Sequence, residues 1–93
     1  MNTIRLECTI GGHNKFYEFL GIESSGRFTV KGLYGAIGQA PKEAIIYDGD
    51  NKTEAEKEFE KKKSEKLKKG YIVVSRNGKS TFAPGEKKSL IFK

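Results

Sequence analysis

The 93-residue sequence contains one cysteine, one histidine, two prolines and no tryptophan. A single cysteine, Cys8, excludes an internal disulfide and a cysteine-based zinc site. Cys8 falls in the apolar phase of a predicted strand, which favours a buried thiol over a nucleophile. No apolar run approaches the roughly 20 residues that span a bilayer, and the first residues enter a strand pattern without a signal-peptide apolar region. We therefore expect a cytoplasmic protein with no membrane partner.

Residue types that carry catalysis are also scarce. The chain shows no Ser–His–Asp order, carboxylate dyad, metal cluster or catalytic cysteine setting. The only histidine, His13, lies in a predicted turn without ligand-type neighbours, so we expect it to be exposed. Gly35 and Gly38 do not form the glycine loop of a nucleotide site and are expected to serve the backbone. The sequence predicts a non-enzymatic protein without metal, cofactor or small-molecule substrate.

The sequence is instead rich in charge, with 18 Lys and Arg against 12 Asp and Glu, a net charge of +6. Hydrophobic residues make up 35% of the chain, so the core is expected to be thin and the whole of residues 1–93 to form one domain. The excess of positive charge favours a polyanion or an acidic protein surface as partner.

Alternation of apolar and polar residues predicts strands over residues 4–10, 15–22, 28–34 and 43–47, joined by short turns as an antiparallel meander. In the second strand, Phe16 and Tyr17 are expected on opposite faces. A fifth strand is predicted over residues 71–75.

A helix is predicted between residues 51 and 69. It begins at a capping box formed by Asn51 and Glu54, or alternatively by Thr53 and Glu56, and stops at Gly70. Its apolar stripe is thin, comprising Ala55, Phe59 and Leu67, and lysine stems are expected to lie along apolar surface beside it.

The C-terminal residues 72–93 are expected to form strands. An Asn-Gly turn at residues 77–78 predicts a β-hairpin, with further strands over 80–83 and 89–92. The predicted fold class is α+β: an antiparallel sheet with a single helix packed on one face, plus this C-terminal hairpin.

Three segments resemble one known family, the WGR domains. They are "HNKFYEF" (13–19), "YGAIGQ" (34–39) and "EAEKEFEKKKSEKLKKGY" (54–71), and the resemblance covers residues 4–71. It implies a small module of sheet and helix. In DNA-dependent poly(ADP-ribose) polymerases such modules bind DNA breaks. There an Asn-Lys pair approaches the terminal 5′ phosphate, and the signature tryptophan packs against the terminal nucleotide.

The resemblance implies that Asn14 and Lys15 contact phosphate and that Tyr34 takes the place of the tryptophan. Tyrosine keeps a flat ring that can pack on a sugar or base. The signature arginine is replaced by Ala36, which offers no charge and no hydrogen-bond donors. Lys63 stands where the family helix usually has an aromatic residue.

Other cations are candidates from charge alone: Arg27 and Lys31 on the sheet, and Lys66 and Lys69 at the basic end of the helix. Each site residue also has a structural interpretation. Tyr34 could close the rim of the sheet, the pair at 14–15 could serve a turn, and the helix lysines could form a solvated face paired with glutamates.

The leading functional hypothesis is a module that binds nucleic acid weakly and without sequence specificity. DNA is favoured over RNA, and ends or nicks are the candidate substrates. The alternative is a protein-interaction module, such as a phage-encoded or toxin–antitoxin-type regulator, that has lost DNA binding and docks on an acidic protein surface.

Overall fold

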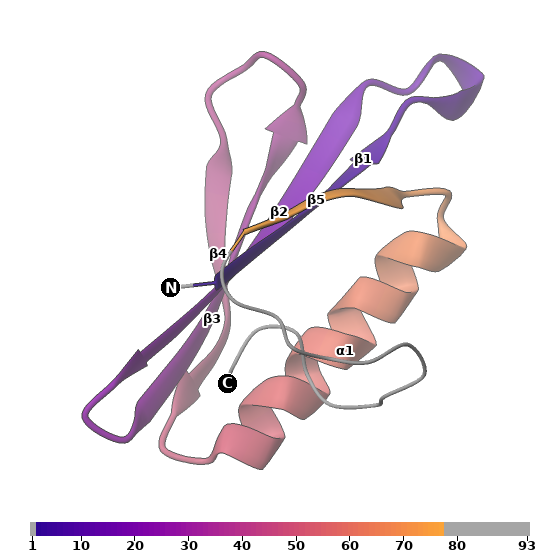
Figure 1. Cartoon of the computed structure of the whole chain (residues 1–93). Helices are drawn as coiled ribbons and strands as arrows, with labels where there is room; N and C mark the ends of the chain where they lie inside the picture. Colours follow the sequence, from indigo (N-terminus) through magenta and orange to yellow (C-terminus); the bar gives the residue numbers. More distant parts are fainter. Residues whose placement is uncertain (1, 78–93) are drawn as a thin grey trace.

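The computed structural model describes residues 2–77, and the predicted strands 80–83 and 89–92 lie outside the described residues, as does the hairpin turn beyond Asn77 (Figure 1). The elements follow one another as β1 (Asn2–Cys8), a 3-10 helix (Ile10–Gly12), β2 (Lys15–Ser24), β3 (Arg27–Ala36), β4 (Lys42–Gly49), α1 (Lys52–Lys68) and β5 (Ile72–Asn77).

The strands form one antiparallel sheet in the order β4-β3-β2-β1-β5. The first four strands pair with their sequence neighbours, which confirms the predicted meander. After α1 the chain returns to pair β5 with β1 at the opposite edge from β4. The helix packs on one face of the sheet (Figure 1), so the predicted α+β arrangement is confirmed.

Two predicted boundaries were wrong. The first strand ends at Cys8 and not at residue 10, because Ile10–Gly12 turns into a 3-10 helix in which Gly11 adopts a positive φ of 61°. The loop expected over 35–42 is shorter, because Gly35 continues the β3 ladder opposite Phe16 and Lys42 already pairs with Tyr34.

Helix α1 is capped by side-chain and backbone groups at its two ends. The amide side chain of Asn51 accepts a hydrogen bond from the Glu54 N–H at 3.0 Å, which identifies Asn51 as the N-cap residue. At the other end, the Gly70 N–H donates to the Leu67 carbonyl at 3.2 Å, and Gly70 has a φ of +99°. Glycine adopts this left-handed conformation without steric cost and terminates the helix there.

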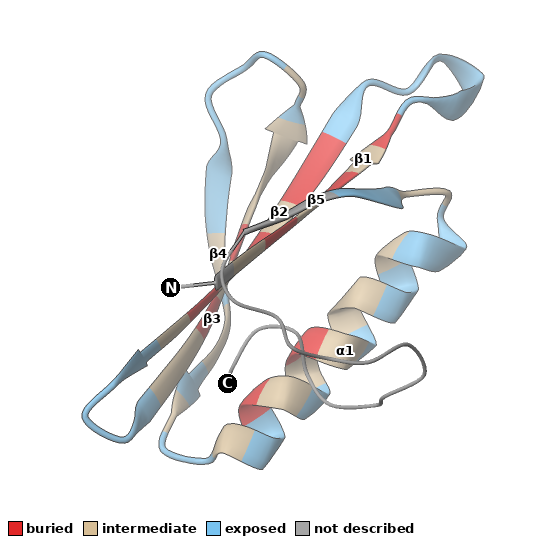
Figure 2. Ribbon diagram, in the orientation of Figure 1, coloured by how far each residue is buried: buried red, intermediate tan, exposed pale blue. Residues whose placement is uncertain are grey.

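The core lies between the sheet and the first half of α1. Figure 2 marks its buried residues, which come from β1, β2, β3 and the helix: Ile4, Leu6, Tyr17, Phe19, Val30, Ala55 and Phe59. The rings of Phe19 and Phe59 meet edge to face with centroids 5.2 Å apart. This contact joins the central strand to the helix and fixes which face of the sheet is covered.

The prediction that Leu67 belongs to the buried stripe was wrong, since Leu67 is 42% exposed. At about 100° per residue, Leu67 is rotated by roughly 80° from Phe59 around the helix axis, whereas Lys66 is rotated by only about 20°. Lys66 therefore points toward the sheet in place of Leu67. The Lys63 ammonium lies 5.2 Å from the centre of the Phe59 ring, so its stem covers apolar surface as expected.

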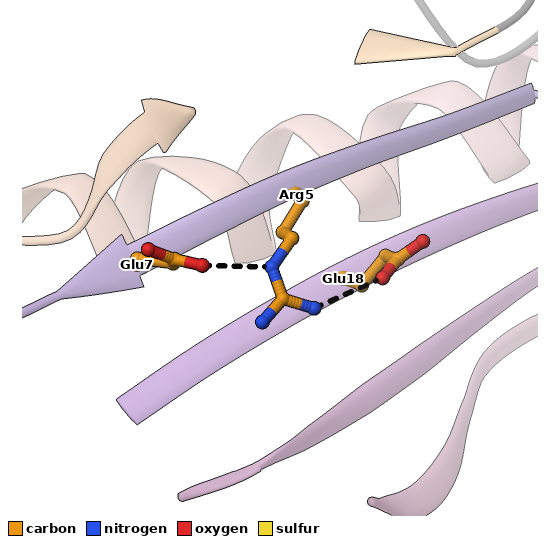
Figure 3. A network of polar contacts seen from close by, with 3 residues as sticks. All are labelled: Arg5, Glu7 and Glu18. Atoms are coloured by element: carbon orange, nitrogen blue, oxygen red, sulfur yellow. Dashed lines mark hydrogen bonds and ion pairs between the residues drawn. The ribbon is translucent and has the colours of Figure 1, made fainter. Parts of the chain in front are cut away.

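The other face of the sheet carries a cluster of ionic side chains (Figure 3). Arg5 Nε lies 2.9 Å from Glu7 Oε2, and Arg5 Nη1 lies 3.4 Å from Glu18 Oε1. The same guanidinium stands 4.2 Å above the centre of the Phe16 ring. Two carboxylates around one arginine leave this cluster with a net negative charge.

Candidate nucleic-acid interface

Most of the predicted site residues meet at one end of the sheet, on its helix side. Lys15 begins β2 and pairs with Ala36 at the end of β3, while Tyr34 pairs with Lys42 at the start of β4. Since side chains alternate along a strand, these residues share a face with Tyr17, which is buried under α1. The last turn of α1 ends above the same area.

Two tyrosines form the apolar base of this region. The rings of Tyr17 and Tyr34 stack with centroids 5.6 Å apart and planes 10° from parallel. Tyr17 is buried, whereas Tyr34 is half-buried. Space for the Tyr17 ring comes from Gly32, where an added Cβ would lie 2.7 Å from Tyr17 Cε1. Tyr34 thus packs on the edge of the core through Tyr17 and still reaches the surface.

Lys66 lies over these rings. Its ammonium is 4.7 Å from the centre of the Tyr17 ring and 5.6 Å from that of Tyr71. Partial burial lowers the pKa of Lys66, and repulsion from neighbouring lysines, Lys69 first and Lys15 among them, lowers the pKa further. The cations of β2 and of the helix end therefore lie within electrostatic reach of one another.

A groove of about 510 Å³ opens at this end of the sheet. Its lining combines aromatic rings with ammonium groups: Tyr17, Tyr34, Tyr71, Lys15, Lys42 and Lys66. A smaller hollow of about 310 Å³ is lined by Lys15, Lys66 and Tyr71 as well, together with Cys8, His13 and Lys69. Within residues 2–77, no Asp or Glu lines either space. The combination is suited to a flat, negatively charged ligand.

Asn14 is exposed and lies directly before β2. Its carbonyl accepts a hydrogen bond from the Ile37 N–H at 3.0 Å. This bond ties the corner at Asn14 and Lys15 to the loop that follows Ala36. Asn14 itself lines neither hollow, although His13 and Lys15 on each side of it do.

The structure does not bring Arg27 and Lys31 into this group. Arg27 follows the β2–β3 turn, and its Nε lies 2.8 Å from Asp48 Oδ1. Hydrogen bonds from Arg27 and Thr29 lower the pKa of Asp48. Lys31 alternates onto the face opposite the helix, with its Nζ 3.6 Å from Glu43 Oε1.

Tyr17, Lys42 and Tyr71 belong to the site, although the sequence assigned them no role there. Alternation along β2 places Tyr17 on the face of the sheet opposite to that of Phe16. That pattern alone does not say which ring or which lysine lies beside Tyr17. The neighbours of Tyr17 follow from the register of the strands, which pairs Tyr17 with Tyr34 and Tyr34 with Lys42.

Two general features of residues 2–77 limit the kinds of site. No group of three His, Cys, Asp or Glu side chains is gathered as a metal-binding cluster would require. The helix in this part of the chain is too short and too polar to cross a membrane.

A sheet with one covering helix defines a small α+β domain, and lysines and tyrosines line one end of it. The family model of the WGR domain matches residues 2–79, and the chain belongs to this family. The WGR domain is a nucleic-acid-binding type of module rather than a catalytic one. No curated protein matches the chain. Comparison with solved structures gives no match either.

Proposed function

We propose that this WGR domain binds DNA weakly and without sequence specificity, with a preference for strand ends or nicks. The observation that carries the proposal is the groove around the Tyr17–Tyr34 stack, which lysines from β2, β4 and α1 line. Among the described residues 2–77, no carboxylate lines it.

The lysines are the proposed phosphate contacts. Lys15, Lys66 and Lys69 form no ion pair within residues 2–77, so binding phosphate breaks no existing pair. Contacts to phosphate place a protein on nucleic acid but do not read its sequence. Asn14, at the exposed corner, is proposed to donate to the terminal phosphate. Arg27 and Lys31 are excluded from this interface because each is paired with a carboxylate elsewhere.

Tyr34 is the proposed contact for the sugar or base. Stacking of a base on an aromatic side chain contributes about 1–3 kcal/mol, and the Tyr17 ring holds Tyr34 in place for it. Bases inside a duplex have both faces covered by their neighbours. An end or a nick exposes such a face, which is the physical reason for the proposed preference.

The test is a mobility-shift titration that compares nicked duplex, blunt duplex, single-stranded DNA and RNA at physiological salt. Nicked duplex is expected to bind best. Three lysine–phosphate contacts predict a slope of about −3 for the logarithm of affinity against that of salt concentration. Equal affinity for all four ligands would contradict the end preference, and no binding would contradict the proposal itself.

The sharpest variant is Lys15→Glu, with Lys57→Glu as the matched control. Both residues are exposed and both changes alter the net charge equally. Lys57 lies about two and a half helical turns from Lys66, on the other side of α1. Lys15→Glu is expected to weaken binding at least tenfold and Lys57→Glu by less than about twofold. Equal losses would show that net charge matters and this surface does not.

The alternative partner, an acidic protein surface, would use the same cations. It predicts DNA retention only at very low salt, together with specific binding to an acidic protein that Lys15→Glu abolishes. Repeating the mobility-shift titration at graded salt concentrations separates the two hypotheses.

A further inference from the structure

Lys42 occupies a position that the sequence left without a role. It is the first residue of β4 and the direct partner of Tyr34 in the β3–β4 ladder. It is exposed, lines the same groove as Tyr34 and Ala36, and forms no ion pair within residues 2–77. The carboxylate next to it in sequence, Glu43, alternates onto the other face and pairs with Lys31.

We propose that Lys42 is a further nucleic-acid contact, which holds the phosphate on the β4 side of the nucleotide packed on Tyr34. This inference rests on the proposed function. Lys15 and Lys66 hold the phosphate on the opposite side of the same nucleotide.

The spacing of the strands supports two separate phosphate positions. β2 and β4 flank β3, and neighbouring strands lie about 4.8 Å apart, so the backbones that carry Lys15 and Lys42 are separated by roughly 10 Å across the sheet. Tyr34 stands on the strand between them. Ammonium groups that rise from these two strands on either side of Tyr34 are suited to two phosphates, one on each side of the same nucleotide.

The proposal also accounts for Ala36. This residue stands third in the stretch 34–36 that resembles the family signature, and it carries no charge. Lys42 brings an ammonium to the same groove from the neighbouring strand. The positive charge at this end of the sheet is therefore supplied from a different backbone position.

A consequence follows for the ligand. The recognised unit is a nucleotide with phosphate on both sides, and not a terminal phosphate alone. A nucleoside 3′,5′-bisphosphate is expected to displace labelled nicked DNA at a lower concentration than the matching 5′-monophosphate, and this difference is expected to vanish in Lys42→Gln.

The experiment measures affinity for 5′-phosphorylated nicked duplex by fluorescence anisotropy, with wild type, Lys42→Gln and Lys57→Gln. Lys42→Gln is expected to lose about three- to tenfold in affinity and to reduce the salt slope by about 1. Lys57→Gln is expected to match wild type. Adding Ala36→Arg to Lys42→Gln is expected to restore most of the loss, because it returns a cation to the groove.

The outcomes separate this inference from the proposed function. If wild type binds and Lys15→Glu weakens it while Lys42→Gln behaves like Lys57→Gln, the role of Lys42 is overturned and the function stands. If wild type does not bind, both are overturned. Thermal melting of each variant confirms folding, and since Lys42 is exposed, Lys42→Gln is expected to melt with wild type.

Discussion

The ring of Tyr17 stacks on that of Tyr34 at a centroid distance of 5.6 Å, so a buried residue of β2 holds a surface residue of β3 in a fixed orientation. Tyr17 is in turn held by Phe19, at a centroid distance of 4.8 Å, and covered by the Lys66 ammonium. The aromatic part of the site is therefore continuous with the core. Under the proposed function, ligand contacts at Tyr34 would be made by a ring that is already packed against Tyr17.

Replacing Tyr34 tests whether its ring contributes to binding. Tyr34→Phe keeps the flat ring and is expected to bind nicked DNA within about twofold of wild type. Tyr34→Leu removes it and is expected to lose about 1–3 kcal/mol of binding free energy. Anisotropy titrations measure both variants. Wild-type affinity in Tyr34→Leu would identify Tyr34 as a residue that only closes the sheet rim.

Gly32→Ala is expected to destabilise the fold. The added methyl would lie 2.7 Å from two carbons of the Tyr17 ring, inside contact distance. Overpacking of this kind costs about 1–3 kcal/mol, which corresponds to a fall in melting temperature of about 4–8 °C per kcal/mol. Combining it with Tyr17→Leu is expected to cost less than the sum of the two single changes. If the two losses of stability were additive, Gly32 would not be needed to make room for the Tyr17 ring.

Asn51→Ala and Thr53→Ala compare the two caps that the sequence allowed. Asn51 accepts the Glu54 N–H at 3.0 Å, so Asn51→Ala is expected to cost about 1 kcal/mol in the free energy of unfolding. Thr53 is exposed, and Thr53→Ala is expected to be nearly neutral. Urea denaturation measures both, and the reverse order would place the helix start two residues later.

The lowered pKa of Lys66 predicts a pH dependence of binding. Burial and neighbouring lysines disfavour its charged form, so the folded state is penalised while Lys66 is charged. This penalty is complete below the folded pKa of Lys66 and is lost as pH rises from that pKa to the usual value of 10.5. Above 10.5 the side chain is neutral in both states. A bound phosphate favours the charged form. Affinity is therefore expected to fall as pH rises through the folded pKa of Lys66, below 10.5.

Lys66→Arg provides the control, because a guanidinium stays charged throughout this range. Affinity for nicked duplex is measured between pH 7 and pH 10 at constant ionic strength. A smaller decline in Lys66→Arg than in wild type supports a direct phosphate contact. Parallel profiles would show that other groups control the decline.

The fold was predictable where it follows from local sequence patterns. Alternation located the four meander strands, and the capping residues located α1 within one or two positions. The site was predictable only in part. Lys15, Tyr34 and Lys66 line one groove, while Lys69 lines the smaller hollow. The position of Lys42 depends on how two strands are paired, which local composition does not specify.

The differences between predicted and observed positions have a common physical origin. Arg27 was selected for its charge, yet its partner Asp48 lies 21 residues away in the sequence and becomes visible only once β3 and β4 are paired. Leu67 was selected for its apolar side chain, although its angle around the helix axis carries it away from the sheet. Residue type alone predicts neither a cross-strand partner nor an orientation.

The pairing of charges gives different parts of the molecule a different electrical character. Arg5, Arg27 and Lys31 each lie beside carboxylates. Within residues 2–77, the lysines that line the two hollows on the helix side form no ion pair: Lys15, Lys42, Lys66 and Lys69. Such an asymmetry acts on a diffusing molecule before any contact is made. In the field of a polyanion, the domain would rotate so that the Tyr34 end leads, and a larger share of collisions would be productive.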